Sequence, residues 1–194
     1  MKKWLYIIVV FSIYSCCPGG VSNADYGPLP ESALGFVPYL DDSIYSFKHS
    51  DGSVIHYQAI RETNQDWSHC ADCCFEFSYE KNTTRMVPDQ QIFEIIVEIS
   101  NEDTVTLSCV VQLAQYFFTI PTEEEQYPNF EMVDSLLIGT TYYYDVFKLG
   151  SPQHPYTNND PVKMDSLYYN YGSGILKIIM SDGGYYQLIP PSGS

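Results

Sequence analysis

The chain has 194 residues and is strongly acidic, with 24 aspartates and glutamates against 9 lysines and arginines and a formal net charge of −15. This charge opposes binding to nucleic acid and to anionic lipid, both of which attract basic surfaces. The length suits one domain whose core needs no metal or disulfide support. We therefore expect a single acidic domain with no cofactor and no nucleic-acid partner.

Residues 1–15 have the layout of a secretory signal peptide. Two lysines precede an apolar run from Trp4 to Tyr14, and Ser15 stands directly before Cys16. The run is shorter than the roughly 18 residues that a membrane-spanning helix needs. We therefore expect export of the protein and no transmembrane helix.

The end of this signal, Ile13-Tyr14-Ser15-Cys16, resembles the lipobox of bacterial lipoproteins, in which the signal is cut before the cysteine and the cysteine receives lipid. The alternative is an ordinary cleaved signal followed by a disulfide-forming Cys16. Residues 16–40 contain several glycines and prolines, which suit a flexible tether. This favours a lipid anchor at Cys16, with 16–40 as anchor and tether.

From residue 43 onward, short runs rich in Val, Ile, Tyr, Phe and Thr alternate with turn residues, a pattern typical of β-strands. For 41–191 we expect a single all-β domain, an antiparallel meander that forms a lipocalin-like barrel or a two-sheet sandwich. Asp134 to Gly139 also suits a short helix. The expected strands are Ser43–Lys48, Val54–Ile60, Cys74–Tyr79, Ile92–Ile99, Val105–Gln112, Tyr116–Ile120, Met132–Ile138, Tyr142–Leu149, Ser166–Tyr171, Ile175–Met180 and Tyr185–Ile189.

Two glycine-containing turns predict hairpins. Asp51-Gly52 lies between two apolar runs, and Asp182-Gly183-Gly184 separates the last two runs of the chain. Glycine accepts the positive φ that tight hairpin turns require. The strands on either side of each turn should therefore pair antiparallel.

Two longer segments are expected to be loops, where a β scaffold commonly carries its function. The first, Glu62 to Cys73, contains Trp67 and His69, and the second, Gly150 to Pro161, contains Tyr156. Exposed aromatic rings stack on sugars, peptides or partner proteins. Trp67, His69 and Tyr156 are therefore the candidate contacts for a ligand or partner.

Four cysteines, Cys70, Cys73, Cys74 and Cys109, follow the anchor region, an even number in a compartment that permits disulfides. The adjacent Cys73 and Cys74 rarely pair with each other, because the trans peptide holds their side chains apart. We expect two disulfides among the four cysteines. Zinc is the alternative, since Cys70-x-x-Cys73 has a usable ligand spacing, but a second ligand pair is missing, and we expect no metal.

No catalytic motif is present: the chain has no Gly-x-Ser-x-Gly elbow, no His-Glu-x-x-His and no glycine-rich phosphate loop. The four histidines are scattered singly, and many acids, including Glu94 and Glu98, are available as carboxylate pairs. We assign no catalytic residue. A hydrolase with an unrecognised carboxylate or histidine site is the alternative to a binding protein.

The chain as a whole resembles the small lipoproteins of Bacteroidota. The resemblance rests on Ser15-Cys16-Cys17 after a lysine-led signal, and on the closing segments Tyr168 to Ile178 and Asp182 to Leu188. In those proteins a similar ending forms the last hairpin of a β domain. Surface-displayed members often carry acidic residues just after the anchor cysteine, whereas Pro18-Gly19-Gly20-Val21-Ser22 follows here. The resemblance thus implies an outer-membrane lipoprotein on the periplasmic side.

Four Asp-Ser/Thr-aliphatic triplets resemble the O-glycosylation sequon of the same lineage, in which a sugar on an exposed hydroxyl solubilises the surface. The alternative is that Asp and Ser favour turns and the aliphatic residue opens the next strand. The candidate acceptors are Ser43, Thr104, Ser135 and Ser166.

Together these features predict a lipid-anchored envelope protein without enzymatic activity. It would contact the membrane through its N-terminal lipid and bind an envelope protein, a glycan or a small apolar ligand.

Overall fold

The computed structural model of the chain describes residues 22–70, 75–102, 104–111, 116–120, 130–150 and 164–190. Across these residues the structure is almost entirely β, which confirms the expected fold class. Within this part of the chain no helix is long and apolar enough to span a bilayer. The helix α2 covers only Glu31–Leu34.

The described residues form one continuous sheet of twelve strands. Eleven of them follow the order β7-β6-β5-β4-β3-β2-β12-β11-β10-β9-β8, and every pair along this path is antiparallel. The remaining strand, β1, pairs parallel with β4. The strands are β1 (Ser22–Asp25), β2 (Ile44–His49), β3 (Val54–Cys70), β4 (Phe75–Pro88), β5 (Ile95–Ser100), β6 (Thr106–Val111), β7 (Tyr116–Ile120), β8 (Phe130–Ile138), β9 (Thr141–Gly150), β10 (Met164–Asn170), β11 (Gly174–Met180) and β12 (Tyr185–Leu188).

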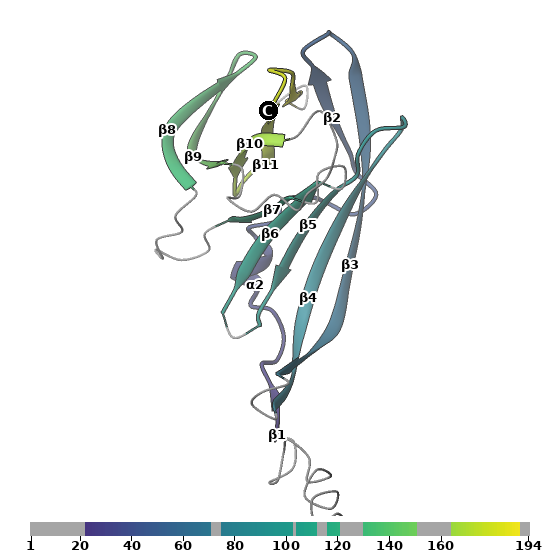
Figure 1. The fold of residues 1–194 in the computed structure, drawn as a ribbon, viewed down its shortest axis with the longest axis vertical. Coiled ribbons are helices and arrows are strands. Elements are labelled where there is room, and N and C mark those ends of the chain that lie inside the picture. The colour runs from purple at the N-terminus through teal and green to yellow at the C-terminus, as the bar shows by residue number, and fades with distance from the viewer. Residues whose placement is uncertain are drawn as a thin grey trace, which may run out of the picture.

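This sheet curls into a half-barrel, so that β7 at one edge contacts β9 and β10 in the other half (Figure 1). The described strands therefore form a curled sheet rather than two separate ones. Both glycine turns form hairpins as predicted: Gly52 has φ 97° and joins β2 to β3, and Gly183 has φ 86° and joins β11 to β12.

One core cluster draws buried side chains from all the strands from β2 to β12, most regularly from β5 and β6. In β5 and β6 the burial alternates strictly, and the buried residues of the two strands lie opposite one another. Period-two burial of this kind is what one solvent-facing and one core-facing surface produce. The buried set in these two strands is Ile95, Val97, Ile99, Leu107, Cys109 and Val111.

Three tyrosines are completely or almost completely buried with their hydroxyl groups bonded. The hydroxyl of Tyr39 accepts the N–H of Ile175 at 2.6 Å, and that of Tyr169 donates to the carbonyl of Phe36 at 2.5 Å. Tyr57 donates to a backbone carbonyl at 3.3 Å. Because a buried hydroxyl without a partner is costly, these bonds let large polar rings fill the core.

The expectation of a flexible tether over 16–40 is wrong for residues 22–40. Val37 and Tyr39 are 1% and 0% exposed and pack in the core cluster together with Leu29 and Ala33. The Arg61 guanidinium donates to the carbonyls of Val37 and Tyr39 at 3.3 and 3.1 Å, which ties this segment to β3. The glycines and prolines of residues 22–40 therefore lie in an ordered segment rather than in a flexible tether.

Two further expectations are corrected by the strand bounds. Of the expected loop from Glu62 to Cys73, the described part up to Cys70 is strand, since β3 continues to Cys70 in unbroken register with β4. Neither face of this part of β3 covers a core, so its residues are polar and lack the apolar alternation that indicates a strand in the sequence. Asp134 to Gly139 is not a helix: Asp134 to Ile138 belong to β8, which pairs with β9.

Candidate functional site

Several sequence-predicted residues lie outside the described part of the chain. These are the lipid-anchor candidate Cys16, the cysteines Cys73 and Cys74, and the aromatic candidate Tyr156. Cys70 is described only as the last residue of β3. Their predicted roles stay predictions.

Cys109 does not take part in a disulfide. It is a free thiol with no exposed surface, and burial raises its pKa to about 12. Cross-strand pairing places Cys109 opposite Val97, Val97 opposite Thr84, and Thr84 opposite Arg61 of β3. Cys70 lies nine residues beyond Arg61 on the same strand. At the rise of an extended strand this is roughly 30 Å, far beyond the reach of a disulfide. The expected role of Cys109 as a disulfide partner is therefore wrong.

Trp67 and His69 lie near the end of the long β3–β4 hairpin rather than in a loop. Trp67 is 64% exposed. The His69 imidazole lies 3.8 Å from the carboxylate of Glu76 on the facing strand. Neither residue lines the pocket described below.

The four candidate glycosylation sites differ in exposure. Thr104 and Ser135 are exposed and Ser43 is partly exposed, which keeps their hydroxyls accessible. Ser166 is 4% exposed and lies in β10 between Gly150 and Ile179 of the neighbouring strands. The burial of Ser166 contradicts its assignment as an exposed acceptor.

A pocket of about 440 Å³ opens where β2 begins and β12 ends. The start of β2, the residues that follow β12, the β10–β11 turn and one residue of β9 come together there. The chain brings them together because Leu188 of β12 lies opposite Phe47 of β2, and the N–H of Ile189 donates to the carbonyl of Ser46 at 2.8 Å. The described lining is Pro38, Ile44, Tyr45, Ser46, Tyr143, Gly172, Ser173, Leu188, Ile189 and Pro190.

Tyr45 is held rigidly in this lining. Its hydroxyl accepts the N–H of Leu40 at 2.9 Å and donates to the carbonyl of Pro38 at 3.4 Å. Its ring packs edge-on against the buried ring of Tyr39, with the centroids 5.0 Å apart. These contacts fix the position of the Tyr45 ring in the pocket wall.

The described lining contains no charged side chain, and two of its apolar residues are exposed. Ile44 is 68% exposed and Ile189 37% exposed. Pockets of roughly 300–1,000 Å³ with apolar and aromatic walls and a few polar groups are typical of small-molecule sites. The tyrosine rings, the Ser46 and Ser173 hydroxyls and the turn backbone suit a neutral ligand with apolar and hydrogen-bonding parts.

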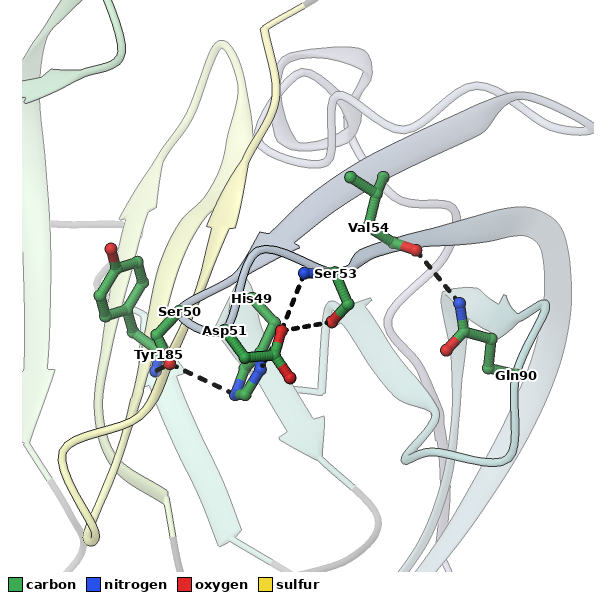
Figure 2. Close-up of polar contacts among 7 residues, drawn as sticks. All are labelled: His49, Ser50, Asp51, Ser53, Val54, Gln90 and Tyr185. Atoms are coloured by element: carbon green, nitrogen blue, oxygen red, sulfur yellow. Dashed lines mark hydrogen bonds and ion pairs between the residues drawn. The ribbon is translucent and has the colours of Figure 1, made fainter.

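A second arrangement surrounds His49 in the β2–β3 turn (Figure 2). Its Nδ1 lies 3.0 Å from Oδ1 of Asp51, and its Nε2 lies 3.5 Å from Oγ of Ser50. Asp51 also accepts hydrogen bonds from the N–H and hydroxyl of Ser53 at 2.8 and 2.7 Å, and these bonds, with the one from His49, lower the pKa of Asp51 to about 2. A serine, a histidine and an aspartate in this connectivity are the groups of a nucleophilic triad.

The surroundings of His49 provide little else that such chemistry needs. The nearby N–H groups of Gly52, Gly183 and Gly184 donate to the carbonyls of His49 and Met180 and to the carboxylate of Asp182. They are thus not free to stabilise an oxyanion, which is usually the largest contribution to acyl transfer. The same bonds close the two adjacent hairpin turns.

The acids Glu94 and Glu98 are each paired with a cation. Glu94 lies 3.1 Å from the Arg85 guanidinium and Glu98 3.6 Å from the Lys81 ammonium. Across the described residues no group of three or more His, Cys, Asp or Glu side chains is placed to hold a metal ion.

A comparison of the chain with protein-family models, with curated proteins and with solved structures found no match.

Proposed function

We propose that the protein is a lipid-anchored envelope protein, held to the periplasmic side of the outer membrane through Cys16, that binds a neutral ligand in the pocket between β2 and β12. The observation that carries the binding function is the preformed pocket of about 440 Å³ with Tyr45 and Tyr143 in an uncharged wall. The layout of residues 1–16 supports the anchor.

The charge of the chain favours a neutral ligand over an anion. With a net charge of −15, the protein repels anions at long range, and no described lining residue supplies a compensating cation. Exposed Ile44 and Ile189 in the pocket wall favour contact with an apolar group. The expected ligand class is therefore an uncharged amphiphile, such as a sugar carrying an apolar substituent.

The test measures the depletion of a water-soluble probe when proteoliposomes that carry the mature protein are pelleted. The neutral probe is p-nitrophenyl glucoside, and the matched anionic probe is p-nitrophenyl sulfate. Ser173→Trp fills the pocket, whereas Ser135→Trp adds the same ring to an exposed position of β8. We expect saturable retention of the neutral probe that Ser173→Trp abolishes and Ser135→Trp preserves. Equal retention by both variants would exclude the pocket as the binding site.

A hydrolase is the second candidate, favoured by the Ser50–His49–Asp51 connectivity. A fluorophosphonate, which phosphonylates activated serines with loss of fluoride, distinguishes the two functions. Because the surrounding N–H groups are engaged, we expect no labelling of Ser50. Labelling that Ser50→Ala removes would replace the binding function with the hydrolase.

A further inference from the structure

The outer part of the β3–β4 hairpin carries exposed aromatic rings on both faces. We call residues 65–70 and 75–80 the hairpin arm, since it extends beyond the part of β4 that pairs with β5 (Figure 1). Trp67 is opposite Ser78 of β4. Phe75 precedes Ser78 by three residues, an odd number, and so points to the other face. Trp67 and Phe75 are 64% and 44% exposed, and Tyr26, 41% exposed, packs edge-on against Phe77.

The described chain begins at the end of this arm. Ser22 of β1 lies opposite Phe75, and β1 runs parallel to β4, away from the arm's end. Cys16 precedes Ser22 by six residues. An extended chain covers at most about 3.6 Å per residue, so Cys16 stays within about 22 Å of the arm's end.

The ligand pocket lies at the other end of the same strands. Ile44 of the pocket wall is opposite Gln58, which is twelve residues from Cys70 on β3. This separation is roughly 40 Å at the rise of an extended strand. A lipid on Cys16 therefore brings the arm to the membrane while leaving room for the pocket to face away.

The charges near Trp67 favour a zwitterionic surface. Asp66 is paired with Lys81 at 2.7 Å, and Glu76 lies 3.8 Å from His69, so both acids have a basic neighbour. The net charge of −15 still opposes an anionic surface. Tryptophan and tyrosine rings settle at the headgroup level of a bilayer, where one end of the ring is wet and the rest is apolar.

We propose that the hairpin arm docks on the zwitterionic surface of the bilayer that holds lipidated Cys16, through Trp67, Phe75 and Tyr26, and that the pocket faces away from this membrane. The proposal rests on the lipid anchor of the proposed function. It is independent of what the pocket binds.

Trp67 itself is the probe for the test. The chain has two tryptophans, and Trp4 is lost with the signal, so Trp67 is the only one in the mature protein. Lipidation is first established by palmitate labelling and intact mass. The lipidated protein is then reconstituted in phosphatidylcholine vesicles that carry bromine on the acyl chains near the headgroup. We expect loss of Trp67 emission relative to vesicles without bromine, and a smaller loss when phosphatidylglycerol is added.

The matched control moves the tryptophan to the far end of the molecule. In the double variant Trp67→Tyr, Tyr142→Trp the only indole sits on β9 at a position that is 58% exposed. We expect its emission to be insensitive to brominated lipid. A lipidated protein whose Trp67 is quenched no more than Trp at 142 overturns the docking and leaves the anchor standing. Absence of palmitate overturns the anchor and the docking together.

Discussion

Replacing Tyr39 by Phe tests whether the segment before β2 is part of the folded core. The change keeps the ring that packs against Tyr45 and removes only the hydroxyl that accepts the Ile175 N–H at 2.6 Å. Because Tyr39 and Ile175 are fully buried, that N–H loses its acceptor where water does not reach. An unsatisfied buried donor costs about 1–3 kcal/mol. For a protein of this size a loss of about 2 kcal/mol lowers Tm by roughly 4–8 °C.

The matched control is Tyr45→Phe, which also deletes a hydroxyl that accepts a backbone N–H. Its donor belongs to Leu40, whose residue is 66% exposed, so water can replace the lost bond. We expect a cost of about 0.5–1 kcal/mol. Urea unfolding of the mature chain and its two variants gives both values. A Tyr39→Phe cost no larger than that of Tyr45→Phe would refute the assignment of Tyr39 as a buried, obligatory hydrogen-bond acceptor.

Four further outcomes follow from the structure. In an NMR titration the Asp51 carboxyl should have a pKa of about 2, and Ser53→Ala should raise this pKa toward the ordinary 3.8. Because the pKa is lowered in the folded state, the stabilisation by Asp51 is present above pH 3.8 and is lost as the pH falls toward 2. Cys109, with no exposed surface and a pKa raised to about 12, should resist iodoacetamide at pH 8 in the native protein and react only after unfolding, as peptide mass mapping would reveal. Asn101→Ala removes the amide that donates to the backbone carbonyls before α2, at 2.7 Å for the shortest bond, and should destabilise the protein by about 1–3 kcal/mol with faster hydrogen exchange in β1. Glycopeptide mapping of protein from its native host should find no sugar on Ser166, because its hydroxyl is covered in the folded sheet.

The sequence predicts the strands around the core well, because burial of one face imposes alternation. In β5, β6 and β11 the side chains that face the core are almost all aliphatic, and the two glycine turns mark where the chain reverses. Local patterns and turn chemistry are sufficient to find such strands.

The same reasoning fails where a strand covers no core. Thr63 to Cys70 is polar and would be a loop by composition, yet each residue pairs with β4 in unbroken register. Backbone hydrogen bonds, cross-strand pairs such as His69 with Glu76 and the added strand β1 stabilise it. These contacts depend on residues far apart in the chain, so no window of sequence contains them.

Sequence reasoning likewise found only part of the candidate site. Of the candidates predicted from the sequence, Trp67 and His69 lie on the hairpin arm, whereas the pocket is built largely from residues that carried no motif. These include Gly172 and Ser173 in a turn, two prolines and isolated aliphatic residues. Tyrosine abundance was the one available signal, and Tyr45 and Tyr143 do line the pocket. Which tyrosines would face a cavity depends on how the sheet curls, and curvature is not a local property of the chain.

The ordered N-terminal segment changes what a lipid at Cys16 would do to the domain. A flexible tether over the whole of 16–40 would let the domain turn in any direction, since its end-to-end distance grows only with the square root of its length. Here β1 is paired with β4, and Asn101 donates to the carbonyls of Tyr26, Gly27 and Pro28, so the chain leaves the fold at a fixed point. A two-stranded hairpin is marginally stable in water, and β1 supplies the third strand beside the arm. If Cys16 carries a lipid, the segment that leads to it also stabilises the nearby arm, and membrane attachment would be linked to the orientation of the pocket.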